Sequence, residues 1–179
     1  MLIDESGLLM APLVRRTWAL RGRTPQLLQR GKHRERVSVA AALAWRPDND
    51  RLTLVYETLV NAYYNNERTA GFLERLMREL PRRLLVLWDG GPMHKGDPIR
   101  ACVERFAPRL TLERLPAYAP MLNPVERAWR WLKYGRLANF AAQDARHLNH
   151  AVRMELDAVA EDQAYLRSFW HTSELPWPG

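Results

Sequence analysis

Three acidic residues stand at places where a folded chain could bring them together. Asp4 follows a short apolar run at the N-terminus, and Asp89 follows a longer one and precedes two glycines. Glu126 comes three residues after Asn123, where a helix rich in tryptophan and arginine is expected to begin. Carboxylates that meet at one edge of a sheet repel each other unless divalent cations neutralise them. A set of oxygen ligands favours Mg²⁺ or Mn²⁺ over zinc.

Each acid also has a purely structural explanation. Asn123 is a favoured N-cap and Pro124 suits the first helical position, so Glu126 would stand at the third. A glutamate there can bond back to the cap N–H, or pair with Arg130 one turn later. The two aspartates could be solvated residues at strand ends. A helix cap would tolerate glutamine, whereas a metal site needs the negative charge.

The excess positive charge of the chain is confined to one segment. The net charge is +7, from 27 basic and 20 acidic residues. Residues 15–36 carry eight basic residues and one acid, and the remaining 19 of each sign cancel. The eight are Arg15, Arg16, Arg21, Arg23, Arg30, Lys32, Arg34 and Arg36. Such clustering is typical of a protein that binds a phosphate backbone. A solvated, arginine-rich surface is the alternative.

The bulk composition indicates one globular domain. The chain has 179 residues, of which 47% are hydrophobic and 26% charged. The single cysteine, Cys102, excludes an internal disulfide and fits a reducing compartment. No apolar run is long enough to cross a membrane, and the N-terminus lacks the pattern of a signal peptide.

The elements that would position the acids change from strands to helices along the chain. After a short first strand at 2–6, alternating and β-branched residues predict an antiparallel meander. Helical spacing and buried runs then predict alternating helices and strands, including a strand buried on both faces just before Asp89. The expected strands are 15–22, 36–45, 51–60, 82–91 and 110–116, and the expected helices are 65–80 and 98–106. From residue 123 the chain is expected to be mostly helical, with a bend inside 144–170. This order predicts a mixed α/β sheet with helices packed on it.

The helix that follows Asn123 has one clear apolar stripe. Val125, Ala128, Trp129 and Leu132 are spaced i, i+3, i+4 and i+7, which predicts a buried face beside Glu126. We interpret its tryptophans, Trp129 and Trp131, as packing residues rather than platforms for stacking bases.

Four stretches together resemble the DDE transposases, in particular the catalytic domain of mariner-type bacterial insertion-sequence transposases. IDESG (3–7) resembles the first-aspartate motif, and RRTWALRGRTP (15–25) resembles the segment that follows it. LLVLWDGGPMHKG (84–96) resembles the second-aspartate motif with its trailing histidine. PAYAPMLNPVERAWRWLKYGRLANF (116–140) resembles the glutamate motif, and 36 residues separate Asp89 from Glu126, close to the family spacing.

The resemblance implies a ribonuclease H-like fold, with a mixed five-stranded sheet flanked by helices. It implies that Asp4, Asp89 and Glu126 are catalytic and hold two Mg²⁺ or Mn²⁺ ions for phosphodiester hydrolysis and strand transfer. The implied partners are transposon-end and target DNA, with a homodimer in the DNA complex and no membrane partner.

The resemblance and the charge pattern also give candidate DNA contacts outside the acids. The basic residues of 15–36 are the first group, and the second consists of His94, Arg127, Arg130 and Lys133. A loop histidine and a solvated helix face are the structural alternatives. Glu5 should point away from Asp4 if the segment is extended, so we do not expect it to be a ligand.

Proteins of this type usually carry N-terminal helix-turn-helix domains, and this chain begins three residues before Asp4. We therefore expect residues 1–179 to form one catalytic domain without that region, in a cytoplasmic, nucleoid-associated bacterial protein. An inactive DNA-binding remnant with the same fold is the alternative function. A structural domain without a nucleic-acid role is a third possible function.

Overall fold

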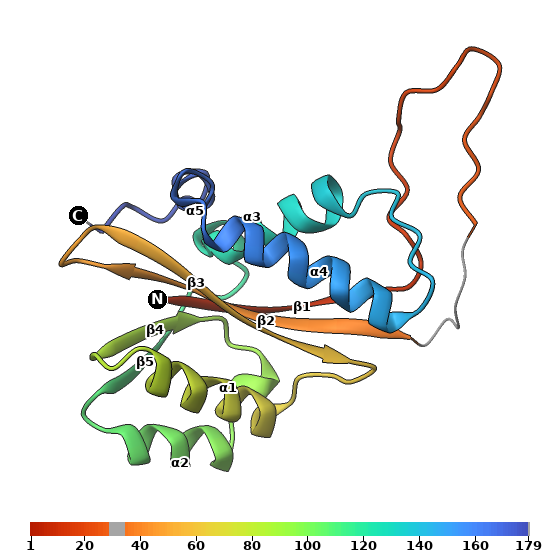
Figure 1. Cartoon of the computed structure of the whole chain (residues 1–179). Coiled ribbons are helices and arrows are strands. Elements are labelled where there is room, and N and C mark those ends of the chain that lie inside the picture. The colour runs from red at the N-terminus through yellow and green to blue at the C-terminus, as the bar shows by residue number, and fades with distance from the viewer. Residues whose placement is uncertain (29–34, 179) are drawn as a thin grey trace.

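The chain folds around a mixed five-stranded sheet, in a computed structural model that describes residues 1–28 and 35–178 (Figure 1). The strands lie in the order β3-β2-β1-β4-β5. Their bounds are Leu2–Leu9 (β1), Arg36–Arg46 (β2), Arg51–Val60 (β3), Leu84–Trp88 (β4) and Leu110–Arg114 (β5). β1, β2 and β3 pair antiparallel, and β4 pairs in parallel with both β1 and β5. The predicted meander followed by parallel strands is confirmed.

Helices cover both faces of this sheet, as Figure 1 shows. One layer consists of α3 (Pro124–Trp131), α4 (Ala145–Ala160) and α5 (Gln163–His171), and the other of α1 (Asn66–Glu79) and α2 (Asp97–Phe106). Alternate strand residues divide between the two cores. Leu2 and Val39 are buried with α3, α4 and α5, whereas Ile3 and Ala40 are buried with α1 and α2.

Side-chain caps begin the helices where the sequence provides short polar residues. The side chain of Asn65 accepts a hydrogen bond from the backbone N–H of Arg68 at the start of α1. The bend expected within 144–170 is the junction of α4 and α5, and Asp162 starts α5 by accepting from the N–H groups of Ala164 and Tyr165. None of the helices in the described residues has the length and hydropathy of a membrane span.

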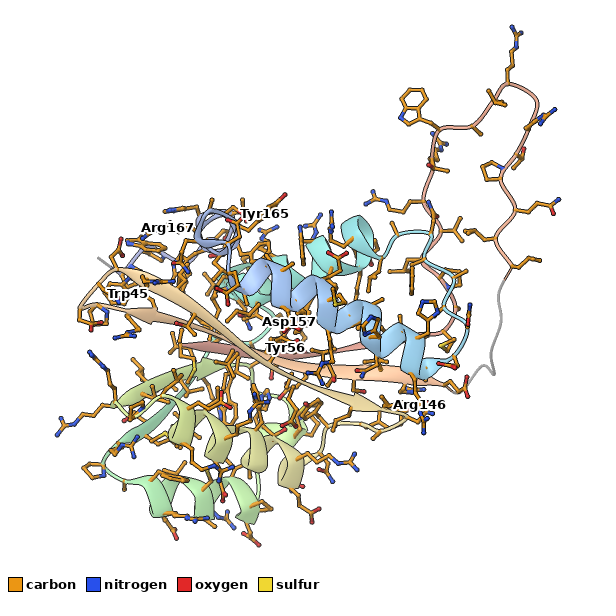
Figure 2. The ribbon with its side chains drawn as sticks, in the orientation of Figure 1. Trp45, Tyr56, Arg146, Asp157, Tyr165 and Arg167 are labelled. Atoms are coloured by element: carbon orange, nitrogen blue, oxygen red, sulfur yellow. The ribbon has the colours of Figure 1, made fainter. Side chains whose placement is uncertain are left out.

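The C-terminal helices are fastened to the edge strand β3. The Tyr56 hydroxyl donates to the carboxylate of Asp157 on α4, and both side chains are labelled in Figure 2. Gln163 of α5 forms two bonds with the backbone of Leu52, since its amide donates to the carbonyl at 2.8 Å and accepts from the N–H at 3.1 Å. The Gln163 amide therefore pairs with β3 as another strand would.

Two features of the sheet differ from the sequence-based predictions. β1 is a full strand of eight residues rather than a short stub at 2–6. β4 is not buried on both faces, because Leu85 is 51% exposed. The reason is that α3, α4 and α5 pack on β1, β2 and β3, so part of β4 is left uncovered on that side.

The predicted strand at 15–22 is also wrong. Leu9 already pairs with Arg36, so residues 10–28 belong to the connection between β1 and β2 and lie outside the sheet. The described part of this connection, 10–28, contains no strand. Leu13 and Arg15 are bonded to Asn139, and the connection then projects away from the helices (Figure 1). Trp18 within it is fully exposed. Residue types that favour strands do not form a strand where no neighbouring strand is available for pairing.

Candidate active site

Asp4 and Asp89 lie at the fork where β1 and β4 separate. The two parallel strands share one paired position, Leu2 opposite Leu87, and the N–H of Leu87 donates to the carbonyl of Met1 at 2.8 Å. Asp4 lies two residues beyond this pair on β1, and Asp89 lies two residues beyond it, directly after the end of β4. Side chains at equal offsets on parallel neighbours lie side by side, so the strand pairing itself brings the two carboxylates together.

Glu126 reaches the same place because Asn123 attaches the start of α3 to β1. The side-chain oxygen of Asn123 caps the helix by accepting from the N–H of Val125 at 3.1 Å. Its amide nitrogen donates to the carbonyl of Ile3 at 3.1 Å, and the residue is buried. This second bond joins α3 to the residue immediately before Asp4 and places the first turn of the helix beside it.

The three acids line one cavity of about 410 Å³, with the proline-containing loop 115–120 as another wall. Their proximity affects ionisation. Burial, followed by the charge of Glu126, raises the pKa of Asp4 to about 7, and Glu5 and Asp89 contribute in the same direction. A carboxyl group this costly to ionise is expected where a bound cation normally offsets the negative charges.

Glu126 has no structural partner among the described residues. Its carboxylate forms neither a bond to the N-cap nor an ion pair with Arg130 within that part of the chain, so neither structural explanation given above applies. Burial raises the pKa of Glu126. The positive charge of Lys133 lowers it, and the negative charge of Asp89 raises it further. Glu126 is therefore a half-buried acid available to bind something else.

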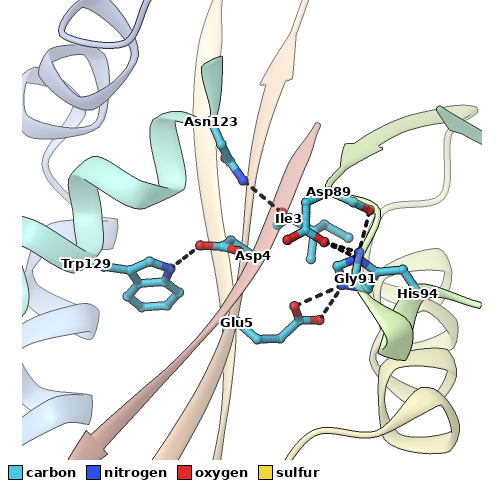
Figure 3. Close-up of polar contacts among 8 residues, drawn as sticks. All are labelled: Ile3, Asp4, Glu5, Asp89, Gly91, His94, Asn123 and Trp129. Atoms are coloured by element: carbon cyan, nitrogen blue, oxygen red, sulfur yellow. Dashed lines mark hydrogen bonds and ion pairs between the residues drawn. The ribbon is translucent and has the colours of Figure 1, made fainter. Parts of the chain in front are cut away.

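The other two acids are held by neighbours, as Figure 3 shows. Asp4 Oδ2 accepts from the indole N–H of Trp129 at 2.7 Å. Asp89 Oδ1 lies 2.7 Å from Nδ1 of His94 and accepts from the N–H of Gly91 at 2.8 Å. In the described ranges, no three His, Cys, Asp or Glu side chains close on a common point as they would around one ion.

His94 is a buried link between two acids. Its ring stacks on Trp88 with 4.3 Å between centroids, and its Nε2 lies 3.0 Å from the carboxylate of Glu5. Burial opposes the charged form, but the hydrogen bond and charge of Glu5 outweigh it, so the pKa of His94 is raised. Glu5 points away from Asp4, in agreement with the alternation expected for an extended segment.

This placement corrects the expected role of His94 as a DNA contact. The side chain is 3% exposed, and both ring nitrogens are engaged by Glu5 and Asp89. A group enclosed in this way cannot reach a DNA backbone. His94 instead supports Asp89 from behind.

Replacing His94 by alanine is expected to destabilise the fold by about 3 kcal/mol, because it leaves the largely buried Glu5 carboxylate without its partner. Urea unfolding would measure this loss. His150→Ala is the control, since His150 is exposed on α4 and its loss should change stability by less than about 0.5 kcal/mol. Equal effects of the two substitutions would contradict the pairing.

A basic groove of about 830 Å³ borders Glu126 and contains Arg15, Arg130 and Lys133. Arg15 is fixed there by its backbone N–H, which donates to Asn139 at 2.8 Å. Lys133 is half-buried, and burial lowers its pKa against the opposing charges of Glu126 and Asp4. The groove therefore places three of the predicted DNA-binding residues beside one of the predicted catalytic acids.

The other predicted basic contacts are dispersed. Arg16, Arg21 and Arg23 are exposed on the projecting connection. Arg36 stacks over Tyr63 at 4.0 Å. Arg127 is half-buried on α3 outside this groove. Arg30, Lys32 and Arg34 fall outside the described residues.

Sequence reasoning missed two side chains of the site. Trp129 was interpreted as packing, yet it also donates to Asp4, and Glu5 was set aside, yet it holds His94. The spacing of Trp129 from Glu126, one helical turn, was the available signal for the first. No local pattern pairs Glu5 with a histidine 89 positions later.

Comparisons with known proteins agree with the fold and with the arrangement of the three acids. The family model of the DDE superfamily endonucleases matches residues 1–149. Among solved structures, the Mos1 mariner paired-end complex with Mn is 20% identical with a TM-score of 0.64, and the alignment covers 96% of this chain and 50% of that chain. The Mos1 catalytic domain with Raltegravir and Mg is 18% identical, with a TM-score of 0.58 and coverage of 96% and 75%. No curated protein matches the sequence.

These likenesses confirm the ribonuclease H-like fold of the chain, which spans about half the length of the paired-end-complex chains. The family model covers the strands and the helix that carry all three acids, and it extends over more than three quarters of the sequence. The chain therefore belongs to the DDE superfamily endonucleases.

Proposed function

We propose that this chain is the catalytic domain of a transposase that hydrolyses DNA phosphodiester bonds and joins the released strand to target DNA. The observation that carries the proposal is the single cavity lined by Asp4, Asp89 and Glu126, which come from two strands and one helix. Its position next to a groove containing Arg15, Arg130 and Lys133 supports DNA as the substrate.

The chemistry of the three acids fits a pair of Mg²⁺ or Mn²⁺ ions. The donors are all carboxylate oxygens, Glu126 lacks a partner among the described residues, and the pKa of Asp4 is raised by burial and by the acids around it. Asp4, Asp89 and Glu126 would hold the ions, which supply activation of the attacking oxygen and stabilisation of the leaving one. The Mos1 structures with Mn and with Mg support this use of divalent ions.

The remaining residues of the site would bind and orient DNA. Lys133 and Arg130 can contact phosphates that approach Glu126 along the groove, and Arg15 closes its other side. The Mos1 paired-end complex with a left transposon end and the Mos1 strand transfer complex support transposon-end and target DNA as partners, which we propose to be bound by a homodimer.

Cleavage of end-labelled duplex DNA by the purified chain tests this proposal. In Mg²⁺ or Mn²⁺ we expect nicked products that disappear with EDTA. Salt-sensitive DNA binding without any cleavage in either ion would instead identify an inactive remnant. Absence of both binding and cleavage would contradict a nucleic-acid function.

Replacing Arg130 by alanine is expected to weaken DNA binding at low salt and to lower the slope of log K against log salt by about one, because one phosphate contact is lost. Arg78→Ala on α1 is the matched control, since Arg78 is exposed on the opposite face of the sheet. Fluorescence anisotropy at several salt concentrations measures the affinity and the salt slope of each variant. Identical slopes for the two variants would remove Arg130 from the interface.

A further inference from the structure

Trp129 is buried in the core, and the hydrogen-bond partner of its indole is an acid of the candidate active site. The side chain is 3% exposed and packs among the apolar residues between α3 and the sheet. Its indole N–H donates to Asp4 Oδ2 at 2.7 Å, across 125 positions of sequence (Figure 3). A buried indole N–H needs a partner, and many are satisfied by a backbone carbonyl. Trp170, for example, donates to the carbonyl of Pro176 at 3.2 Å.

The partner of Trp129 is an acid of the candidate active site, and the geometry is that of a strong bond. A short bond between an N–H and an ionised carboxylate is stronger and more directional than one between neutral groups. It occupies Oδ2 of Asp4 and leaves Oδ1 without a bond to Trp129. The carboxylate of Asp4 is therefore held in one orientation before any ion binds.

Trp129 also lies on the helix that carries Glu126. The two residues are three positions apart in α3, so their side chains project from neighbouring points of one helix face. Both border the basic groove described above. One turn of α3 therefore provides Glu126 and also holds Asp4 on β1 through the indole of Trp129.

We propose that Trp129 is a positioning residue that sets the orientation of Asp4 and its distance from Glu126 for metal binding. The inference rests on the proposed function, since it assigns Asp4 and Glu126 to the same metal site. Trp129 does not touch the ion in this account; it acts through Asp4.

The chain offers a matched comparison in Trp131. This residue lies on the same helix and packs against Tyr165 and Phe169, with ring centroids 6.0 and 5.9 Å away. Its indole N–H donates to no group in the described residues, and the indole bond to Asp4 comes from Trp129. Trp129→Phe and Trp131→Phe therefore remove the same atoms from the same helix, and only the first removes the bond to Asp4.

Mn²⁺ affinity of the two variants is the first test, measured by electron paramagnetic resonance of the free ion. Loss of a group that orients a ligand typically weakens metal binding about 10-fold to 100-fold. We expect this for Trp129→Phe and an unchanged affinity for Trp131→Phe. Wild-type affinity in a folded Trp129→Phe variant would overturn the proposal.

The indole N–H resonance of Trp129 gives a second test that needs no mutation of the tryptophan. In ¹H–¹⁵N spectra of the wild type, the Trp129 signal should lie downfield, and it should shift on addition of Mg²⁺. In Asp4→Asn it should move upfield and no longer respond to Mg²⁺. A Trp129 signal identical in wild type and Asp4→Asn would overturn the proposal even if Trp129→Phe failed to fold.

The two ideas fail in different ways. Wild-type protein that binds Mn²⁺ and loses affinity in Trp129→Phe, but cuts no DNA, would contradict the proposed function and support the positioning role. Wild-type protein that cuts DNA while Trp129→Phe retains full Mn²⁺ affinity and cleavage would support the function and overturn the positioning role.

Discussion

Replacing Glu126 by glutamine should lower DNA cleavage at least about 100-fold, with the midpoint of urea unfolding almost unchanged. Its carboxylate bonds to nothing in the described part of the chain, so the fold loses no contact. Burial raises the pKa of Glu126, so its ionisation costs free energy in the folded state, and glutamine removes that cost. We expect the stability to change by less than about 0.5 kcal/mol. Cleavage in Mg²⁺ and unfolding in urea measure the two quantities on the same preparation.

Glu67→Gln is the matched control for this substitution. Glu67 occupies the first turn of α1, as Glu126 occupies the first turn of α3, and it is exposed. The same chemical change there should leave cleavage intact. A Glu126→Gln variant that cleaves normally but unfolds much more easily would show that the residue is a cap and not a ligand.

The metal-free protein is expected to lose stability as the pH rises from about 4 to about 7, because Asp4 must ionise in a buried, negatively charged site. Its pKa in the fold is about 7, against an ordinary value of 3.8. The folded state therefore holds its proton where the unfolded state has released it, and the contribution is present at low pH and lost through this window. A shift of this size corresponds to at most about 4 kcal/mol.

Asp4→Asn isolates this effect, since asparagine keeps an oxygen that can accept from Trp129 but carries no charge. The difference in unfolding free energy between variant and wild type should grow in favour of the variant from pH 4 to pH 8. Adding Mg²⁺ should stabilise the wild type most at high pH and leave the variant unaffected. If the unfolding free energies of the two proteins changed equally with pH, the ionisation of Asp4 would not destabilise the fold.

Most of the secondary structure follows from local patterns, and the exceptions have a physical cause. The strands 36–45 and 51–60 and the helix 65–80 agree with β2, β3 and α1 to within one or two residues. The segment 15–22 has the residue types of a strand, but pairing depends on a neighbour that the sequence does not reveal. For the same reason, the exposure of Leu85 could not be predicted, because it depends on which strands the helices cover.

The site was predictable in part. That Asp4, Asp89 and Glu126 would share one cavity followed from their places at strand ends and a helix start, together with the family resemblance. How each acid is held did not follow. The contacts of Asp4 with Trp129 and of Asp89 with His94 join distant segments, and only packing in three dimensions brings them within bonding distance.

The central position of β1 has a consequence for synthesis of the protein. The strand nearest the N-terminus lies between β2 and β4 and carries Asp4, while Glu126 lies on α3. A chain leaving the ribosome can pair β1 with β2 early, but its other edge stays open until β4 emerges, and α3 comes later still. The cavity lined by the three acids is therefore complete only after the chain has been made through α3. A nascent chain that ends before α3 lacks one of the three acids of the proposed catalytic site.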